Sequence, residues 1–189
     1  MYSSNRYPTC YNKHIKKELS LILNCKNVME VPFLKKLILH IGFKDIATEK
    51  RKLVTAFLGL EIISGQKPVI TKSRKAVSVL KIQKDMVIGC KVTLRKNIMY
   101  QFLDKLITIT LPRMNEFPTL QKHQKMNLKK NYTFKLDDLL IFHELEVEYD
   151  KFYKLNNLNL TFETSSKTEI GTRLVLRSFL FPLSDKKNF

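Results

Sequence analysis

Two stretches of the chain, SGQKPVITKSRK (residues 64–75) and IGCKVTLR (residues 88–95), carry most of the information in the sequence. They combine clustered cations, turn-forming Gly and Pro, and the Val, Ile and Thr residues that are typical of strands. The window between Glu61 and Asp85 contains six Lys or Arg and no acidic residue. Because such concentrated positive charge repels itself unless a polyanion lies against it, the pattern indicates a nucleic-acid partner.

The positive charge is confined to the first two-thirds of the chain. The 189 residues carry a net charge of +17 and are 44% hydrophobic, which favours a folded core. Residues 1–135 contain 27 Lys or Arg against 8 Asp or Glu, whereas residues 136–189 contain 7 against 9. We expect one domain over residues 13–183, preceded by an extension (residues 1–12) and followed by a tail (residues 184–189).

Hydrophobic periodicity predicts an α+β fold, with a mainly antiparallel sheet, helices on one face and long basic loops. The predicted strands are residues 34–42, 68–71, 87–94, 139–142 and 158–162. The predicted helices are residues 13–24, 49–63, 97 to about 112, and 168–179. Thr48, Asn97 and Thr168 are the expected N-caps, and residues 116–135 are expected to form a long loop.

The sequence gives little support to catalysis or metal binding. Cys10, Cys25 and Cys90 are widely spaced, so we interpret them as small apolar packing residues. The four His are isolated, and the five Gly form no phosphate-binding motif. Asp137 and Asp138 are interpreted as a solvated turn, and Glu144, Glu146 and Glu148 as the solvent face of a strand. We therefore expect no catalytic residue, no cofactor, no metal and no membrane-spanning segment.

Three basic elements predict an RNA surface. The first is the loop from Thr71 to Lys84, with its cations and hydrogen-bonding groups. The second is the strand from Cys90 to Arg95, where alternate side chains share one polar face. The third is the loop from Lys122 to Lys135, in which Tyr132 and Phe134 are expected to stack on unpaired bases. RNA is favoured over DNA because no recognition helix stands out. An RNA-processing enzyme and a peripheral protein of anionic membranes remain as rivals.

The motifs resemble one family, the bacterial-type large-subunit ribosomal protein L-five. The resemblance rests on NVMEVP (residues 27–32), the two opening stretches, MYQFLDKLI (residues 99–107) and LPR (residues 111–113). It continues more weakly through NYTF (residues 131–134), LTFET (residues 160–164) and the last helix to Phe181-Pro182. It therefore covers nearly the whole chain from about residue 13.

The resemblance implies an α+β protein that binds 5S ribosomal RNA in the central protuberance of the large subunit. Gln66 and Thr93 correspond to family contacts with that RNA, and Lys67, Lys91 and Arg95 would flank them. His40 takes the place of the family's Asn on the first strand. The loop is implied to reach the P-site transfer RNA and the small-subunit head; the residues expected to do so are Lys72, Ser73, Arg74, Lys75, Lys81 and Lys84.

Other implied partners are large-subunit ribosomal RNA and neighbouring ribosomal proteins, with no membrane. Several positions depart from the family pattern, among them Lys96 and Asn115, where Gly and Arg are usual. These departures indicate a divergent organellar member, so we expect a mitochondrial ribosome, with a bacterial cytoplasm or a plastid as alternatives. An RNA-binding assembly factor is the alternative function.

Overall fold

The computed structural model describes residues 6–43, 50–80, 82–114, 125–127, 131–153, 155–166 and 168–183. The chain divides into two compact units. Unit 1 comprises residues 1–37, 94–135 and 161–189, and unit 2 comprises residues 38–93 and 136–160. Within the described residues, no helix is both long and apolar enough to cross a membrane.

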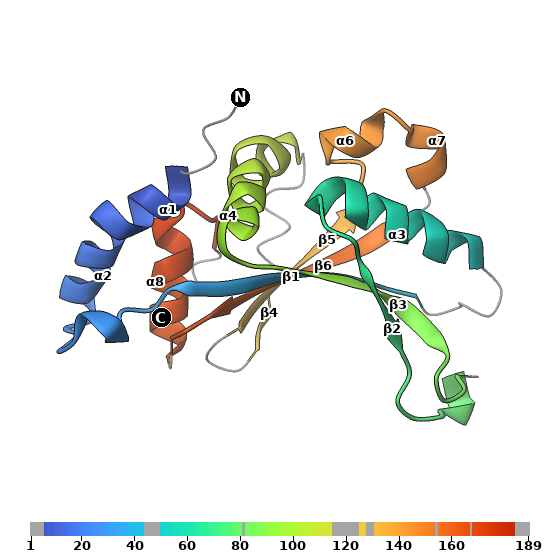
Figure 1. Ribbon diagram of the computed structural model, residues 1–189, viewed down its shortest axis with the longest axis horizontal. Helices are drawn as coiled ribbons and strands as arrows, with labels where there is room; N and C mark the ends of the chain where they lie inside the picture. Colours follow the sequence, from blue (N-terminus) through green and yellow to red (C-terminus); the bar gives the residue numbers. More distant parts are fainter. Residues whose placement is uncertain are drawn as a thin grey trace, which may run out of the picture. The chain divides into compact units, whose positions relative to one another are not determined.

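The strands form one six-stranded sheet in the order β2-β3-β1-β6-β5-β4 (Figure 1). The β2–β3 and β4–β5 pairs are antiparallel, and the expected α+β class is confirmed. The boundary between the units falls inside β1, β3, β5 and β6. The strand bounds are β1 Leu34–Gly42, β2 Val69–Lys72, β3 Val87–Leu94, β4 Lys125–Asn127, β5 Asn131–Asp138 and β6 Asn156–Thr164.

Each long strand buries alternate side chains, as period-two hydrophobicity requires. In β1 the buried residues Leu37, Leu39 and Ile41 alternate with partly exposed ones. The same holds for Cys90, Val92 and Leu94 in β3, and burial raises the pKa of the Cys90 thiol to about 11. One face of the sheet therefore carries the core, and the other is polar and partly open.

Unit 1 is built from three helical segments around aromatic contacts. The ring of Phe179 lies 5.6 Å from Tyr7 and 5.9 Å from Tyr100, between ring centroids. The ring of Phe181 meets Phe134 at 5.7 Å and Phe162 at 5.0 Å. The helices are α1 Arg6–Cys10, which continues through a π-helical turn into α2 Lys16–Ile22, then α4 Lys96–Lys105, extended by turns to Arg113, and α8 Glu169–Ser178.

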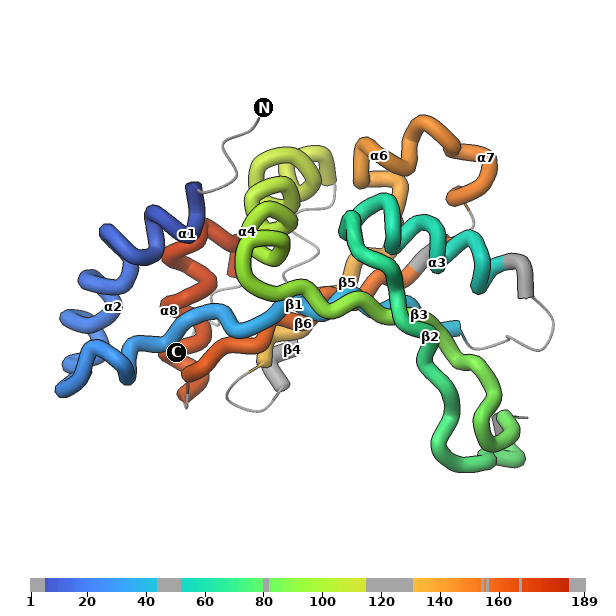
Figure 2. Tube along the Cα trace, in the orientation of Figure 1, coloured from blue at the N-terminus to red at the C-terminus, as the bar shows by residue number. Residues whose placement is uncertain are grey.

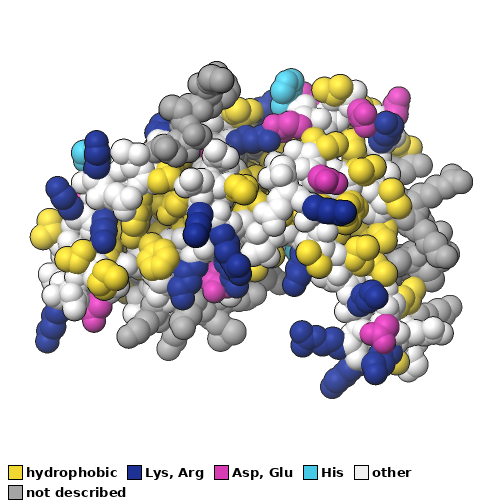
Figure 3. Space-filling view, in the orientation of Figure 1, with side chains coloured by type: hydrophobic (Ala, Val, Ile, Leu, Met, Phe, Trp, Pro, Cys, Tyr) yellow, Lys and Arg dark blue, Asp and Glu magenta, His cyan; other side chains and the backbone are white. Residues whose placement is uncertain are grey.

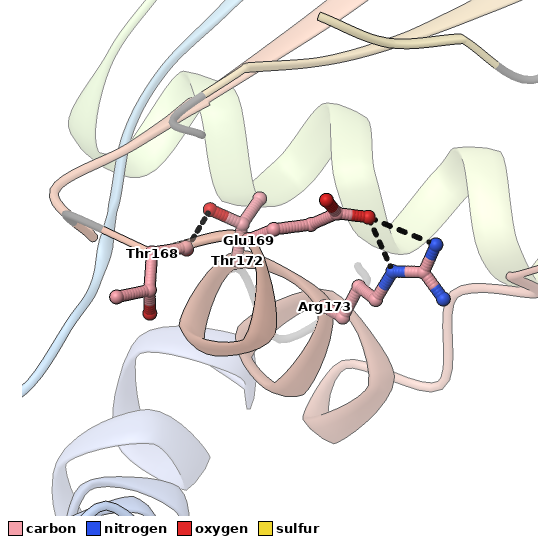
Figure 4. A network of polar contacts seen from close by, with 4 residues as sticks. All are labelled: Thr168, Glu169, Thr172 and Arg173. Atoms are coloured by element: carbon pink, nitrogen blue, oxygen red, sulfur yellow. Dashed lines mark hydrogen bonds and ion pairs between the residues drawn. The ribbon is translucent and has the colours of Figure 1, made fainter. Parts of the chain in front are cut away.

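The start of α8 confirms the expected N-cap. The hydroxyl of Thr168 accepts a hydrogen bond of 3.2 Å from the backbone N–H of Gly171. One turn later, the hydroxyl of Thr172 donates to the Thr168 carbonyl, and Arg173 forms an ion pair of 3.0 Å with Glu169 (Figure 4). These local bonds fix the first turn of the helix.

In unit 2, three helices lie on the same face of the sheet (Figure 1). They are α3 Lys50–Ser64, α6 His143–Glu146 and α7 Tyr149–Phe152. Ala56, Leu60 and Ile63 form the buried side of α3. Helix α3 packs on α6 and α7, and Gly59 of α3 faces Phe152 and Leu155.

Several helix and cysteine predictions need correction. The first helix begins at Arg6 rather than near Lys13. The N-cap residue of α4 is Arg95 rather than Asn97, and its side chain makes no capping hydrogen bond. Cys10 is exposed and Cys25 half-buried, so among the cysteines only Cys90 is a buried packing residue. Thr48 lies outside the described residues.

The prediction of a long loop over residues 116–135 is wrong for the part of this range that the structure describes. Lys125–Asn127 form β4, and residues 131–135 belong to β5 (Asn131–Asp138), where Tyr132, Phe134 and Leu136 are buried at period two. Residues 139–142, expected as a strand, form a turn in which the N–H of Phe142 donates to the carbonyl of Leu139. Residues 115–124 and 128–130 lie outside the described parts.

The prediction that Glu144, Glu146 and Glu148 form the solvent face of a strand is also wrong. These residues lie in and between the short helices α6 and α7. The buried residues here are Phe142, Leu145 and Phe152, whose spacings of three and seven suit helical turns. Asp137 and Asp138 are the exposed last residues of β5, and Asp138 accepts a hydrogen bond from the N–H of Leu140 as the turn begins.

Candidate nucleic-acid interface

The first basic element is a β-hairpin that extends from the sheet. Val69, Ile70 and Thr71 of β2 pair with Lys91, Cys90 and Gly89 of β3. A bulge between Thr71 and Lys72 follows, and the two arms continue away from the helices of unit 2 (Figure 2). The residues expected to form a basic loop are therefore held at the end of a paired ribbon.

Ser73 organises the base of this hairpin. Its backbone N–H donates to the Met86 carbonyl at 2.8 Å, and its carbonyl accepts from the N–H of Asp85 at 3.0 Å. The hydroxyl is turned inward, where it donates a 2.6 Å hydrogen bond to the carbonyl of Lys75. Asp85 has a φ of 62°, which turns the returning arm. The only acidic residue in the sequence between Glu61 and Asp104 thus serves this turn.

A second pair of hydrogen bonds closes the tip. Val77 and Ile82 exchange backbone hydrogen bonds of 2.9 and 3.1 Å, and Ser78–Leu80 form a 3₁₀ turn between them. Val79 at the tip is 89% exposed. The tip therefore presents an apolar side chain beyond the cationic arms.

The cations of the hairpin point to solvent. Lys72, Arg74, Lys75 and Lys84 are all exposed, and Figure 3 shows Lys and Arg side chains gathered over this part of unit 2. Lys81 lies outside the described residues. The arrangement offers several long charged side chains to a phosphate backbone, and its geometry is set by Ser73 and the Val77–Ile82 pair.

The second element is the open face of the sheet in unit 2, opposite the core. His40 of β1 and Lys91 and Thr93 of β3 lie on this face, because they alternate with the buried residues of their strands. Lys91 is exposed, whereas His40 and Thr93 are half-buried. The structure therefore brings together three of the six residues expected to bind RNA.

The surroundings of His40 favour its neutral form. Burial lowers the pKa of its imidazole, and the positive charge of Lys91 lowers it further. The ring lies over Gly42, where an added methyl group would come 3.1 Å from its Cε1 atom. At neutral pH the side chain can thus donate one hydrogen bond and accept another beside a cation.

Gln66 and Lys67 lie in the turn between α3 and β2. Gly65 ends the helix with a φ of 64°, and its N–H donates to the Glu61 carbonyl at 2.8 Å. The Ser64 hydroxyl accepts from the N–H of Gln66 at 3.2 Å. This bonding fixes the backbone and leaves both side chains exposed. Arg95, also exposed, belongs to unit 1 as the residue before α4.

The third basic element does not provide stacking rings. Tyr132 and Phe134 are each 1% exposed, and both rings pack against Phe181. Burial raises the pKa of the Tyr132 hydroxyl well above its ordinary value. The expectation that these rings contact bases is therefore wrong, because they complete the core of unit 1.

Two polar residues of the open face were missed by the sequence interpretation. Thr71 is half-buried opposite Gly89, and Asn159 of β6 is half-buried between Leu158 and Leu160. A signal was present for Asn159, because a polar residue between two buried ones in a strand must lie on the opposite face. Together with His40 and Thr93 they line the open face with hydrogen-bonding groups.

Comparison with known proteins gives concordant results along the chain. The family described as "Ribosomal protein L5" matches residues 27–83, and the model of the C-terminus of the same ribosomal protein family matches residues 87–183. A protein of Dichelobacter nodosus named "Large ribosomal subunit protein uL5" is 39% identical over 91% of this chain and 94% of its own length. The protein of the same name in Nitrosomonas europaea is 38% identical over 93% and 96%. "Large ribosomal subunit protein uL5m" of Reclinomonas americana is 36% identical over 96% of this chain and all of its own.

Proposed function

Because the chain belongs to the ribosomal protein L5 family of structural, non-enzymatic large-subunit proteins, we propose that it binds 5S ribosomal RNA and contacts the P-site transfer RNA. In this proposal the open face of unit 2 and the turn at Gln66 bind the 5S RNA. The hairpin reaches the transfer RNA and the small-subunit head through Lys72, Arg74, Lys75, Lys81 and Lys84, and Ser73 acts within the hairpin to position these cations. Large-subunit ribosomal RNA and adjacent ribosomal proteins are the further partners.

The observation that carries the proposal is the open face itself. One side of β1 and of β3 is buried, while the other presents His40, Lys91 and Thr93 as a hydrogen-bonding and cationic surface. Such a face suits recognition of RNA by shape, ribose hydroxyls and phosphates. Lys67, Lys91 and Arg95 would contribute phosphate contacts, and Gln66 and Thr93 would fix the register.

The division of labour can be tested by filter binding at matched salt. The double variant Gln66→Ala, Thr93→Ala removes two side-chain hydrogen bonds, for which we expect a loss of about 2 kcal/mol, or roughly 30-fold in affinity for 5S RNA. The matched control is Gln101→Ala, Thr108→Ala, whose positions are exposed on and just after α4. Unchanged affinity in the first variant would reject the proposed contacts.

A triple variant separates the hairpin from the open face. Lys72→Ala, Arg74→Ala and Lys75→Ala together should keep 5S RNA affinity within about twofold while weakening transfer RNA binding by ribosomes that carry the variant. Collapse of 5S RNA affinity would contradict separate roles. As a reference, Lys91→Gln removes one proposed phosphate contact. In a plot of the logarithm of 5S RNA affinity against the logarithm of salt concentration, it should reduce the magnitude of the slope by roughly 0.7 to 0.9.

The compartment that we propose is the mitochondrion, with a bacterial cytoplasm or a plastid as the alternatives. The proposal is supported by the departures from the family pattern at Lys96 and Asn115, and a protein named "uL5m" is among the similar proteins. Cosedimentation of the tagged chain with mitochondrial large subunits at moderate salt is the expected result. Migration with another ribosome population would overturn the assignment.

A further inference from the structure

His40 and Lys91 are neighbouring polar groups on the open face of unit 2. Their strands, β1 and β3, are adjacent in the sheet, and the charge of Lys91 acts on the imidazole of His40. The imidazole is half-buried and lies beside Gly42, where an added Cβ would come 3.1 Å from its Cε1 atom. Within the described residues, neither side chain makes a hydrogen bond or an ion pair. The two groups are therefore available to a ligand that approaches this face.

A cation earlier in β1 is neutralised within the fold. Lys36 forms an ion pair of 2.9 Å with Glu163 of β6, and both side chains are 28% exposed. Lys91 is exposed and has no such carboxylate partner among the residues that the structure describes. Its charge is therefore left for an external anion, whereas that of Lys36 is already compensated.

Few other charges surround the imidazole. The residues of this face around it are, strand by strand, Ile38 and Gly42 of β1, Lys91 and Thr93 of β3, and Asn159 of β6. Of these, only Lys91 is charged. Asp137 of β5 and Lys72 of β2 each lie two strands away from β1. Among the described residues, Lys91 is thus the charge that opposes protonation of His40.

Without a ligand, these surroundings favour a neutral imidazole. Burial lowers the pKa of His40 first, and the positive charge of Lys91 lowers it further. A neutral ring has one donor and one acceptor, and only the donor suits a phosphate oxygen. The free protein therefore presents one cation and one neutral ring at this place.

A phosphate group at the same place would reverse the influence of charge. An anion within about 4–6 Å favours the charged form of a basic group, and an anion between the two side chains also offsets the charge of Lys91. A protonated imidazole donates from both ring nitrogens, and its charge-assisted hydrogen bonds are roughly twice as strong as neutral ones. The bound state therefore favours the imidazolium form more than the free state does.

We propose that His40 takes up a proton from solvent when RNA binds to the open face, so that its imidazolium and the ammonium group of Lys91 hold one backbone phosphate together. This inference rests on the proposed binding of 5S RNA by the open face, and it defines the ionic form in which the site acts. The complex binds more protons than the free components do, so the affinity rises as the pH falls. The increase belongs to the range around and below 6.5, the ordinary pKa of an imidazole.

Filter binding of 5S RNA from about pH 8 to about pH 5.5, at constant ionic strength, tests the linkage to protons. The unsubstituted chain should gain about threefold to tenfold in affinity at the acid end, beyond any change that His40→Asn also shows. That variant keeps a hydrogen-bonding side chain that does not titrate, so it reports the contribution of the RNA and of all other groups. The matched control is His143→Asn in α6, on the side of the sheet that the helices cover (Figure 1), and it should retain the full pH dependence. Equal pH profiles for the unsubstituted chain and His40→Asn would refute the proposal.

Isothermal titration calorimetry measures the proton itself. The heats of 5S RNA binding near pH 6.5, compared in buffers of different ionisation enthalpy, should show uptake of roughly half a proton more by the unsubstituted chain than by His40→Asn. Lys91→Gln should take up less than the unsubstituted chain, because its free imidazole is no longer opposed by a neighbouring charge. Equal uptake by the unsubstituted chain and His40→Asn would contradict protonation of His40 in the complex.

The same measurements separate this inference from the proposed function. Tight binding of 5S RNA with equal pH dependence in both proteins would mean that His40 meets the RNA as a neutral ring, which overturns the inference alone. Absence of 5S RNA binding at every pH would overturn both. Far-UV circular dichroism defines the pH range in which each variant is folded, so that acid unfolding is not taken for a change in affinity.

Discussion

The hydroxyl of Ser73 donates a 2.6 Å hydrogen bond to the carbonyl oxygen of Lys75 at the base of the β2–β3 hairpin. Ser73 is only 8% exposed, although it lies between the exposed cations Lys72 and Arg74. Its side chain is therefore directed into the hairpin rather than toward a ligand. The bond bends the chain so that Arg74 and Lys75 point to solvent.

Replacing Ser73 with Ala should loosen the hairpin without altering its charge. Loss of the hydrogen bond leaves the Lys75 carbonyl without this donor, at a cost of about 1 kcal/mol. We expect faster amide hydrogen exchange at Val77, whose N–H donates a hydrogen bond to the carbonyl of Ile82. We also expect severalfold weaker binding of transfer RNA. Ser73→Thr keeps the hydroxyl and is the control. Unaltered exchange at Val77 would show that the hydroxyl does not hold the hairpin.

The sequence predicts β1 and β3 well because their hydrophobic periodicity is strong. The bounds predicted for β1 and β3, residues 34–42 and 87–94, agree with the structure. Frequent Lys and Asn in the sequence of the preceding residues 122–130 obscure the period-two burial of Tyr132, Phe134 and Leu136 in β5. The composition of this region indicates a loop, whereas the spacing of its hydrophobic residues indicates a strand. The spacing is the better guide, because the rings of Tyr132 and Phe134, which were expected at the surface, lie in the core.

The candidate site was predictable only in part. The cations of the hairpin and the polar side of β3 follow from charge and alternation alone. The hydrogen bond from the Ser73 hydroxyl to the Lys75 carbonyl could not be predicted, because it depends on a turn geometry that the sequence does not specify. Outside that site, the exposure of Val54, Leu58 and Ile62 on α3 was likewise not predictable, because they look like core residues until Leu60 and Ile63 are known to fill that role.

Two glycines of unit 2 should respond to alanine in opposite directions. A Cβ on Gly89 would collide with the carbonyl oxygen of Ile41 and lie 3.1 Å from the Cα of Gly42, so β1 and β3 would have to separate. Gly89→Ala should lower the free energy of unfolding by about 1–3 kcal/mol. At Gly59, within α3, the nearest atoms would be 3.5 Å away, in Leu155 and Phe152. Gly59→Ala should therefore raise the free energy of unfolding by up to about 1 kcal/mol through helix propensity.

Urea denaturation of the two glycine variants at the same pH measures both effects. Because each change adds one methyl group to unit 2, the pair controls for the added volume. Equal changes in the free energy of unfolding would mean that close contact between β1 and β3 at Gly89 is not a constraint.

The burial of His40 and the nearby charge of Lys91 should make the stability of the fold depend on pH. The pKa of His40 is below its ordinary value of 6.5 because of burial first and the Lys91 charge second. The unfolded chain therefore binds a proton at a higher pH than the folded chain does, so folding is favoured by deprotonation. The stabilisation is fully present above about pH 6.5 and is lost as the pH falls through the lower pKa of the folded state.

We expect the free energy of unfolding to decrease between pH 7 and pH 5 more steeply in the unsubstituted chain than in His40→Asn. The variant retains a hydrogen-bonding side chain but does not titrate in this range, and the other three His are common to both proteins. Lys91→Gln should produce a smaller reduction of the pH dependence, since it removes only the secondary cause. Parallel pH profiles for the unsubstituted chain and His40→Asn would show that His40 keeps its ordinary pKa on the open face.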